Sequence, residues 1–341
     1  MNKYWHQRTR LLSKGTITPS PSFKVKVKGE ETEVEFDLDD RDIAERWYSV
    51  SPEIISRAMS GYLVHLCKVR REEEGRSDSD NGTITNKLLL VAPALTPPSQ
   101  QQSPPSPPSP SSPPPLPIYV DPFCGVGQDT ISLSKSLTSP PTPHLILTCD
   151  MDLNCLLTTS KNLALHNVSR DTVALVWCNS LALLSEITTN FDCSLPPTCT
   201  TSEGYKMFKL GPSPLTTSCK NHKSIWSGIP EVSLSPGVSN VLEGVFLSPP
   251  WNNTGYYDNG SCGSGVKFSL SSHVRLTSVS GAAVDGVDVV RGWRDKVKKG
   301  GWVCAFVPNT WDEVWEDEGN REVYGHVLNG KHKTSAFYVS R

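Results

Sequence analysis

The sequence has no excess of charge of one sign and no long apolar run. Its 33 lysines and arginines are balanced by 35 aspartates and glutamates, a formal net charge of −2. The protein surface as a whole therefore does not attract nucleic acid or an anionic membrane, and an anionic partner has to meet a local patch of charge. No apolar run approaches the roughly 20 residues of a bilayer-spanning helix, so we expect no membrane association.

The sequence also lacks paired cysteines. Its ten cysteines show no C-x-x-C pair and no Cys/His spacing typical of zinc ligands, so we expect no metal site. With no signal-peptide pattern at the start, this indicates a reducing, intracellular compartment rather than a disulfide framework. The 28 prolines, many of them clustered, indicate one sizeable domain with insertions.

The first region, residues 1–69, is predicted to be an N-terminal extension. Alternating residues over 23–38 predict a β-hairpin whose lysines and glutamates pair across the strands. Ser51 is a natural N-cap that is followed by a proline and a glutamate, which predicts a helix to about Lys68. Residues 70–116 are charged, then rich in proline and serine, and are predicted to be a disordered insertion.

Residues 117–341 are predicted to form an α/β core, with a loop insertion at about 188–240. Alternating strands and helices are typical of a parallel, Rossmann-like sheet. Two strands around an Asn-Gly turn predict a C-terminal antiparallel hairpin. The predicted strands are 118–120, 145–149, 173–177, 244–247, 302–307, 323–328 and 334–339, and the predicted helices are 128–137, 153–166 and 287–299.

The end of the first core strand carries an acid and a glycine turn. Gly125 and Gly127 allow close approach of a ligand to the backbone and open a helix whose N–H groups can receive a polar group. Asp150 follows the next strand, where it can accept hydrogen bonds from ribose hydroxyls. Asp121 precedes the glycines, where it would repel a pyrophosphate but attract a cation. S-adenosylmethionine carries an ammonium and a sulfonium, so we expect this cofactor.

A second strand end reads Ser248-Pro249-Pro250-Trp251. Prolines fix the backbone and leave carbonyls as rigid acceptors, which can orient an exocyclic amine toward a methyl donor. Trp251 offers a face on which a base can stack. Elsewhere in a fold the same residues would be a proline-capped strand with a buried tryptophan. Asn179, after the third strand, can contact adenine or serve as an ordinary turn residue.

The first residues mix cationic and aromatic side chains. Lys3-Tyr4-Trp5 is followed by Arg8, a combination that suits phosphates and stacked bases. The same residues can instead form an amphipathic arm that packs on the protein body. Both interpretations of the arm stay open at this point.

Four segments, in order, resemble the signatures of the trimethylguanosine synthase family, the RNA cap guanine-N2 methyltransferases. The resemblance covers residues 1–68 and 118–180 and, more loosely, 244–341; the insertions have no counterpart. The four segments are Lys3-Tyr4-Trp5 with Gln7-Arg8, Trp47-Tyr48-Ser49-Val50-Ser51-Pro52-Glu53, Asp121 with Phe123-Cys124-Gly125-Val126-Gly127, and Leu247-Ser248-Pro249-Pro250-Trp251.

The resemblance implies a class I S-adenosylmethionine-dependent methyltransferase core with a small N-terminal helical extension. It implies that the 7-methylguanosine cap of small RNAs, snRNA and snoRNA, is converted to 2,2,7-trimethylguanosine. The expected partners are capped RNA and RNP proteins, and the expected state is a monomer without metal. The expected location is the nucleus, in the nucleolus or Cajal-body-like structures, with the cytoplasm as a second location.

By position, the resemblance implies three groups of site residues. The catalytic group, which holds the amine and stacks on the base, is Ser248, Pro249 and Trp251. The cofactor-binding group is Ser51, Asp121, Phe123, Gly125, Gly127, Asp150 and Asn179. The cap-binding group is Lys3, Tyr4, Arg8, Trp251 and Tyr256.

The sequence departs from the family at some of these segments. Leu12 stands where an aromatic residue is expected, and Asn309 where an arginine is expected, which predicts weaker contacts with the cap. Two other functions stay open. One is methylation of another exocyclic amine, guanine N2 of rRNA, adenine N6 or cytosine N4, and the other is cap binding without activity. The Lys3-Tyr4-Trp5 arm favours the cap, and the intact Asp121, Gly125 and Asp150 favour an active enzyme.

Overall fold

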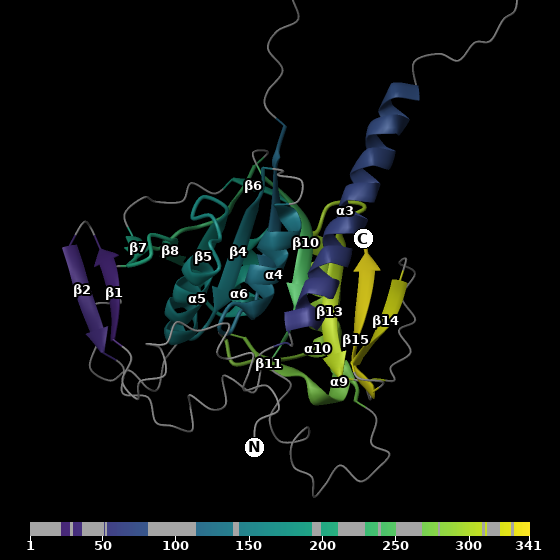
Figure 1. Ribbon diagram of the computed structural model, residues 1–341. Coiled ribbons are helices and arrows are strands. Elements are labelled where there is room, and N and C mark those ends of the chain that lie inside the picture. Colours follow the sequence, from purple (N-terminus) through teal and green to yellow (C-terminus); the bar gives the residue numbers. More distant parts are fainter. Residues whose placement is uncertain are drawn as a thin grey trace, which may run out of the picture.

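One large, mostly parallel sheet with helices on both faces forms the described part of the protein (Figure 1). The computed structural model describes residues 22–27, 30–35, 51, 53–80, 114–138, 143–192, 199–210, 229–237, 240–249, 268–278, 280–308, 311, 321–328 and 331–341. The helices are α3 (Glu53–Asp80), α4 (Gln128–Leu137), α5 (Leu153–Leu165), α6 (Ser180–Glu186), α9 (Leu270–His273) and α10 (Gly286–Lys296).

The described strands range in length from two residues in β9 to ten residues in β15. They are β1 (Ser22–Val27), β2 (Glu30–Glu35), β3 (Leu116–Asp121), β4 (Leu145–Asp150), β5 (Val173–Trp177), β6 (Asn190–Asp192), β7 (Cys199–Thr201), β8 (Lys206–Lys209), β9 (Ser235–Pro236), β10 (Asn240–Leu247), β11 (Arg275–Thr277), β12 (Ala283–Asp285), β13 (Trp302–Pro308), β14 (Arg321–Leu328) and β15 (Lys331–Ser340).

The strand order places a switch point in the middle of the sheet. The order is β14-β15-β13-β10-β3-β4-β5-β8-β7-β1-β2, so the chain runs from β3 outward through β4 and β5 and then returns to β10 on the other side of β3. Strand β15 is antiparallel to both β13 and β14. In the class I methyltransferase arrangement, the last strand of the chain is antiparallel and lies between the two strands that precede it in the sequence. Strand β15 lies in this way between β13 and β14. The predicted fold class is therefore confirmed.

The alternation of side chains along β3 shows how the sheet separates two cores. Tyr119 is buried on the face that α3, α4 and α5 cover, whereas Ile118 and Val120 are buried on the face that α6, α9 and α10 cover. Successive residues of a strand point to opposite faces, so a central strand needs apolar residues at every position. The uninterrupted apolar run of this strand therefore predicts its place at the centre.

Helix α3 is longer than the sequence predicts. It begins just after Ser51, and Ile55, Met59 and Leu63 are buried at a spacing of four, where the helix packs against α4, β10 and β13. It ends at Asp80 rather than near Lys68. The first residues of the predicted disordered insertion, 70–80, are therefore helical. The arginines and glutamates of 70–74 favour a helix, and the helix continues past Gly75, which would be expected to weaken it. No helix of the described residues is long and apolar enough to cross a membrane.

Regular structure forms in the predicted loop insertion at 188–240 and also in the segment 270–285. The insertion at 188–240 contains β6, β7, β8 and β9, and β8 extends the sheet beyond β5. Strand β7 pairs with β1, so the predicted N-terminal hairpin forms and joins the same sheet. Helix α9 and the hairpin β11–β12 were also not predicted. Strands β6 to β9 have two to four residues, which is too short for a periodic pattern in the sequence. They form because they pair with neighbouring strands of the sheet.

Candidate functional site

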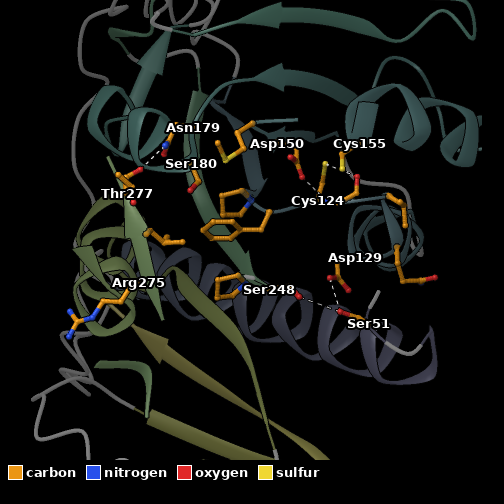
Figure 2. Close-up of a pocket in the computed structure, with 18 residues that line it drawn as sticks. Ser51, Cys124, Asp129, Asp150, Cys155, Asn179, Ser180, Ser248, Arg275 and Thr277 are labelled. Atoms are coloured by element: carbon orange, nitrogen blue, oxygen red, sulfur yellow. Dashed lines mark hydrogen bonds between the residues drawn. The ribbon is translucent and has the colours of Figure 1, made fainter. Parts of the chain in front are cut away.

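A cavity of about 420 Å³ lies at the carboxyl ends of the central strands (Figure 2). It lies at the switch point between β3 and β10, where open α/β sheets bind ligands. Its volume is in the range of sites for small molecules and cofactors. The lining residues are Ser51, Pro122, Phe123, Cys124, Gly125, Val126, Gln128, Asp129, Asp150, Met151, Cys155, Asn179, Ser180, Ser248, Pro249, Arg275, Leu276 and Thr277.

The two predicted glycines occupy different environments in the turn from β3 to α4. Both adopt the left-handed backbone conformation, with φ of 51° at Gly125 and 90° at Gly127. A Cβ on Gly125 would meet no atom within 4 Å, whereas a Cβ on Gly127 would lie 2.8 Å from Cγ2 of Thr159. Gly125 lines the cavity and Gly127 packs against α5 instead. Close approach of a ligand therefore concerns Gly125.

Asp150 lies on the cavity wall at the end of β4, as the sequence predicts. Its Oδ2 accepts a hydrogen bond from the backbone N–H of Gly125 at 3.0 Å, and its Oδ1 accepts one from Asp152 N–H at 2.8 Å. These bonds fix the carboxylate beside the glycine turn. Both oxygens keep further lone pairs, so the group can still accept bonds from hydroxyls of a ligand.

Asn179 also lies on the wall, at the end of β5. Its Oδ1 accepts a bond from Leu181 N–H and caps α6, and its Nδ2 donates to the carbonyl of Thr277 at 2.8 Å. The residue thus fastens the β11 strand to the sheet. These hydrogen bonds give Asn179 the role of a structural turn residue. Contact of Asn179 with adenine stays a prediction.

Asp121 does not line the cavity. Its side chain has an exposed fraction of 0 %, Thr130 Oγ1 donates to Oδ2 at 2.6 Å, and Phe123 N–H donates to Oδ1 at 3.4 Å. Burial, followed by the charge of Asp129, raises the pKa of Asp121. The sequence predicts that Asp121 contacts the cofactor directly. Its buried position away from the cavity wall does not agree with that prediction. The Asp121 side chain instead bonds the backbone of the loop that follows β3 and the first turn of α4.

Asp129 is the carboxylate that reaches the cavity in this part of the site. Ser51 Oγ donates to its Oδ2 at 2.9 Å, and its Oδ1 is buried with no hydrogen-bond partner among the described residues. Burial raises the pKa of Asp129, and neighbouring serine hydroxyls offset part of the rise. We did not predict this residue, because an acid in the first turn of a helix is ordinary helix chemistry.

Ser51 and Ser248 meet across the cavity although 197 residues separate them. Ser51 is 3 % exposed, and its Oγ lies 3.4 Å from Oγ of Ser248. Ser248 and Pro249 follow β10 and line the cavity, as does Phe123. The segment before α3 and the end of β10 thus close one side of the site together, and the functional roles expected of these residues stay predictions.

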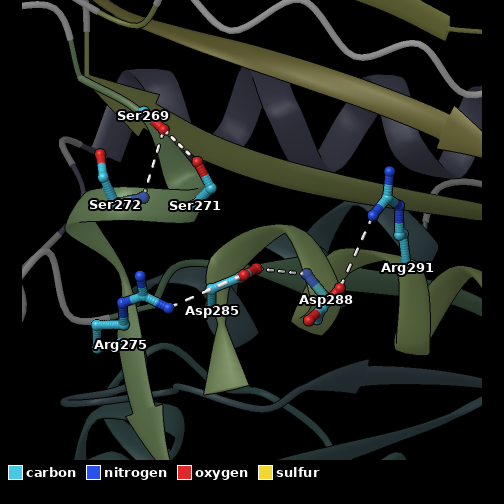
Figure 3. A network of polar contacts seen from close by, with 7 residues as sticks. All are labelled: Ser269, Ser271, Ser272, Arg275, Asp285, Asp288 and Arg291. Carbon is cyan, nitrogen blue, oxygen red and sulfur yellow. Dashed lines mark hydrogen bonds and ion pairs between the residues drawn. The ribbon is translucent and has the colours of Figure 1, made fainter. Parts of the chain in front are cut away.

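The hairpin β11–β12 forms a wall that the sequence did not indicate. Arg275, Leu276 and Thr277 line the cavity. Arg275 pairs with Asp285 at 3.9 Å, and Asp285 in turn caps α10 by accepting a bond from the N–H of Asp288 (Figure 3). These charges anchor the hairpin to α10. The glycine- and serine-rich composition of this region gave no signal for it.

Five predicted substrate residues lie outside the described residues. They are Lys3, Tyr4, Arg8, Trp251 and Tyr256. The departures at Leu12 and Asn309 lie outside them as well. Within the described ranges, no group of three or more His, Cys, Asp and Glu residues could hold a metal ion.

The charges of the cavity wall suit a particular kind of ligand. Among the described lining residues, Asp129 and Asp150 are the two acids and Arg275 is the one cation. Phe123 and Leu276 add apolar surface. A ligand with a cationic end, hydroxyls and an apolar ring matches this wall, because carboxylates favour cations and hydroxyl donors.

Comparisons with known proteins find no matching family model and no matching curated protein. An rRNA methylase from Streptococcus thermophilus shares 8 % identity at a TM-score of 0.34, covering 67 % of this chain and 88 % of that chain. Precorrin 8w decarboxylase from Methanobacterium thermoautotrophicum shares 13 % at 0.28, covering 67 % and 84 %. A Klebsiella pneumoniae protein assigned as an O-methyltransferase shares 10 % at 0.33, covering 66 % and 73 %. Likeness this distant leaves the activity to be argued from the site itself.

Proposed function

We propose that the protein is an S-adenosylmethionine-dependent methyltransferase. The cavity at the switch point supports this proposal. The buried Oδ1 of Asp129 has no partner among the described residues and suits an ammonium group, and Asp150 suits ribose hydroxyls. The open space above Gly125 lets a ligand lie against the backbone. S-adenosylmethionine, when bound, supplies an electrophilic methyl group.

We propose further that the methyl acceptor is an exocyclic amine of a nucleobase. Ser248 and Pro249 stand after the end of β10, on the cavity wall. A hydroxyl and rigid carbonyls at that point can accept hydrogen bonds from an NH₂ group and aim its nitrogen lone pair. Holding the amine in line with the methyl group supplies much of the rate enhancement, because the amine is a weak nucleophile.

The substrate that we propose is the 7-methylguanosine cap of small nuclear and nucleolar RNA, with guanine N2 as the acceptor. The resemblance in four sequence segments supports it. Trp251 would stack on the positively charged 7-methylguanine, and Lys3, Tyr4, Arg8 and Tyr256 would contact the rest of the cap. Because the proposed substrates are small nuclear and nucleolar RNAs, we propose the nucleus as the place of action, with the cytoplasm as a second location.

Calorimetry and a methyl-transfer assay with the full chain test the proposal. We expect S-adenosylmethionine to bind, and methyl label to pass to 7-methylguanosine diphosphate but not to guanosine diphosphate. Mass analysis of the product then counts the methyl groups added. Failure to bind S-adenosylmethionine contradicts the enzyme assignment. Binding with transfer to unmethylated guanosine or adenosine instead contradicts the cap.

Replacement of Trp251, the predicted stacking residue, tests cap recognition separately from cofactor binding. We expect Trp251→Ala to abolish cap methylation with the affinity for S-adenosylmethionine retained. Trp251→Phe is the matched control, because phenylalanine keeps an aromatic face, and it should retain measurable activity. Equal activity of the alanine variant and the wild type contradicts the stacking role.

A further inference from the structure

Three oxygen atoms form a chain from the cavity to a buried carboxylate (Figure 2). Ser248 is partly exposed at the end of β10, and its Oγ lies 3.4 Å from Oγ of Ser51. Ser51 Oγ donates to Oδ2 of Asp129 at 2.9 Å. Ser51 and Asp129 are 3 % and 5 % exposed. The chain therefore connects the proposed position of the amine with an acid that has little access to bulk water.

The direction of the hydrogen bonds in this chain follows from the number of protons. A serine hydroxyl has one proton, and that of Ser51 is given to Asp129. In the contact between the two serines, Ser248 must therefore be the donor and Ser51 the acceptor. The proton of Ser248 is then occupied, so its oxygen faces the cavity as an acceptor only. A group with an N–H to donate fits this oxygen, and a carbonyl does not.

We infer that Ser248 accepts the N–H of the amine and that Asp129, acting through Ser51, takes the proton that the amine releases on methylation. This inference rests on the proposed function. An N–H bond of the amine breaks and an O–H bond forms at Ser248. The proton of Ser248 passes to Ser51, and that of Ser51 passes to Oδ2 of Asp129. The carboxylate becomes a carboxylic acid, and the product leaves with a neutral amine.

The surroundings of Asp129 suit it to accept a proton. Asp121 faces it from β3 and Cys304 from β13. Hydroxyl groups reach it from Ser56 on α3, from Ser51 just before α3 and from Ser248 after β10. Burial raises the pKa of Asp129, and neighbouring serine hydroxyls offset part of the rise. The ammonium proposed for Oδ1 leaves Oδ2, the oxygen bonded to Ser51, as the atom that takes the proton. Methyl transfer moves the positive charge of the sulfonium to the amine nitrogen beside Ser248. An amine that has just been methylated is strongly acidic, so the proton moves downhill.

Replacement of Ser51 tests the relay, because it breaks the chain and leaves Asp129 in place. For Ser51→Ala we expect the single-turnover methylation rate to fall about 100-fold, in the range of general acid–base effects. Because Ser51 lines the cavity, calorimetry first gives the affinity of the variant for S-adenosylmethionine, and the rate is then measured with the cofactor saturating. We also expect the wild-type rate to rise with pH as Asp129 ionises, and this rise to be absent in Ser51→Ala. Ser51→Thr keeps a hydroxyl and should restore both rate and pH profile.

Ser136→Ala is the control on the helix that carries Asp129, because Ser136 Oγ donates only to the Ser132 carbonyl in the described structure. It should match the wild type in rate and pH profile. Unchanged rate and pH profile for Ser51→Ala overturn the relay and leave the proposed function standing. A fall in the rate at saturating cofactor with an unchanged pH profile also overturns it, since Ser51 would then act only by positioning the cofactor. A wild type that methylates no amine overturns the proposed function and this inference together.

Discussion

Two regions of the same sheet bury carboxylates in opposite ways. Glu243 on β10 is 2 % exposed, with Arg71 Nε 3.0 Å from its Oε2 and Lys298 Nζ 3.4 Å from its Oε1. Near the carboxyl ends of the strands, Asp121 and Asp129 are just as buried, but their hydrogen-bond partners in the described structure are hydroxyl and N–H groups. One acid is neutralised by cations, and the other two share a negative site.

The difference separates a structural use of buried charge from a functional one. The ions around Glu243 join α3, β10 and the segment after α10, and the Arg71 guanidinium also donates to Tyr119 Oη. Such a cluster holds helix and sheet together but responds to no ligand. Unneutralised acids in a cavity instead have raised pKa values and attract a cation, which is typical of functional sites.

The largest expected effect is on the neutralised cluster. Glu243→Gln leaves two partly buried cations without their acid, so the free energy of unfolding should fall by about 3 kcal/mol. Urea unfolding at pH 7 measures it. The matched control is Glu231→Gln, because the Glu231 carboxylate pairs with Lys209 at 3.5 Å but is 59 % exposed. The control should lose less than about 0.5 kcal/mol. Equal losses would show that burial does not distinguish the two acids.

A second prediction concerns the packed and open glycines of the cavity loop. Gly127→Ala strains a backbone with φ of 90° and pushes a methyl group to 2.8 Å from Thr159. The free energy of unfolding should fall by about 2 kcal/mol. Gly125→Ala is the control, since it meets only the backbone cost, about 1 kcal/mol. Thermal unfolding of both variants tests the order, and a larger loss at Gly125 would contradict it.

A third prediction uses pH to separate the two kinds of acid. The folded-state pKa of Asp121 is raised by burial, so the stability that its protonated form contributes is complete below about pH 4 and is lost as pH rises through the folded value. Asp121→Asn removes this loss and keeps an oxygen for Thr130. The variant should be about 1 kcal/mol more stable than the wild type at pH 8, and no more stable at pH 4.

Urea unfolding across this pH range measures the difference. Asp171→Asn serves as the control, because Asp171 is exposed, and it should show no such crossover. A wild type that exceeds Asp121→Asn in stability at pH 8 would contradict the charge balance described for the site.

The smallest effect is expected at an exposed pair on the cavity wall. Arg275 and Asp285 lie 3.9 Å apart with side chains 54 % and 25 % exposed (Figure 3). Arg275→Gln should lower the free energy of unfolding by less than about 0.5 kcal/mol. Thermal unfolding at low and high salt measures it. A loss as large as that at Glu243 would mean that the hairpin depends on this pair.

The sequence by itself determined the order and type of the core elements. Apolar runs mark β3, β4, β5, β10 and β13, and the Asn-Gly turn marks the last hairpin, because burial on both faces and turn chemistry are local requirements. The same local rules identified Gly125, Asp150 and Ser248 as cavity residues. Each stands at the end of a recognisable strand, where a parallel sheet collects polar groups.

Only the tertiary structure decided which acid reaches the cavity. In the sequence, both acids stand at positions where an aspartate is common. Asp121 precedes a glycine turn, and Asp129 lies in the first turn of α4. Their tasks depend on where the backbone turns and on α3, which brings Ser51 to Asp129 across 78 positions. The contact of Ser51 with Ser248 and the wall formed by β11 depend on long-range packing in the same way. Periodicity within one segment carries no information about such contacts.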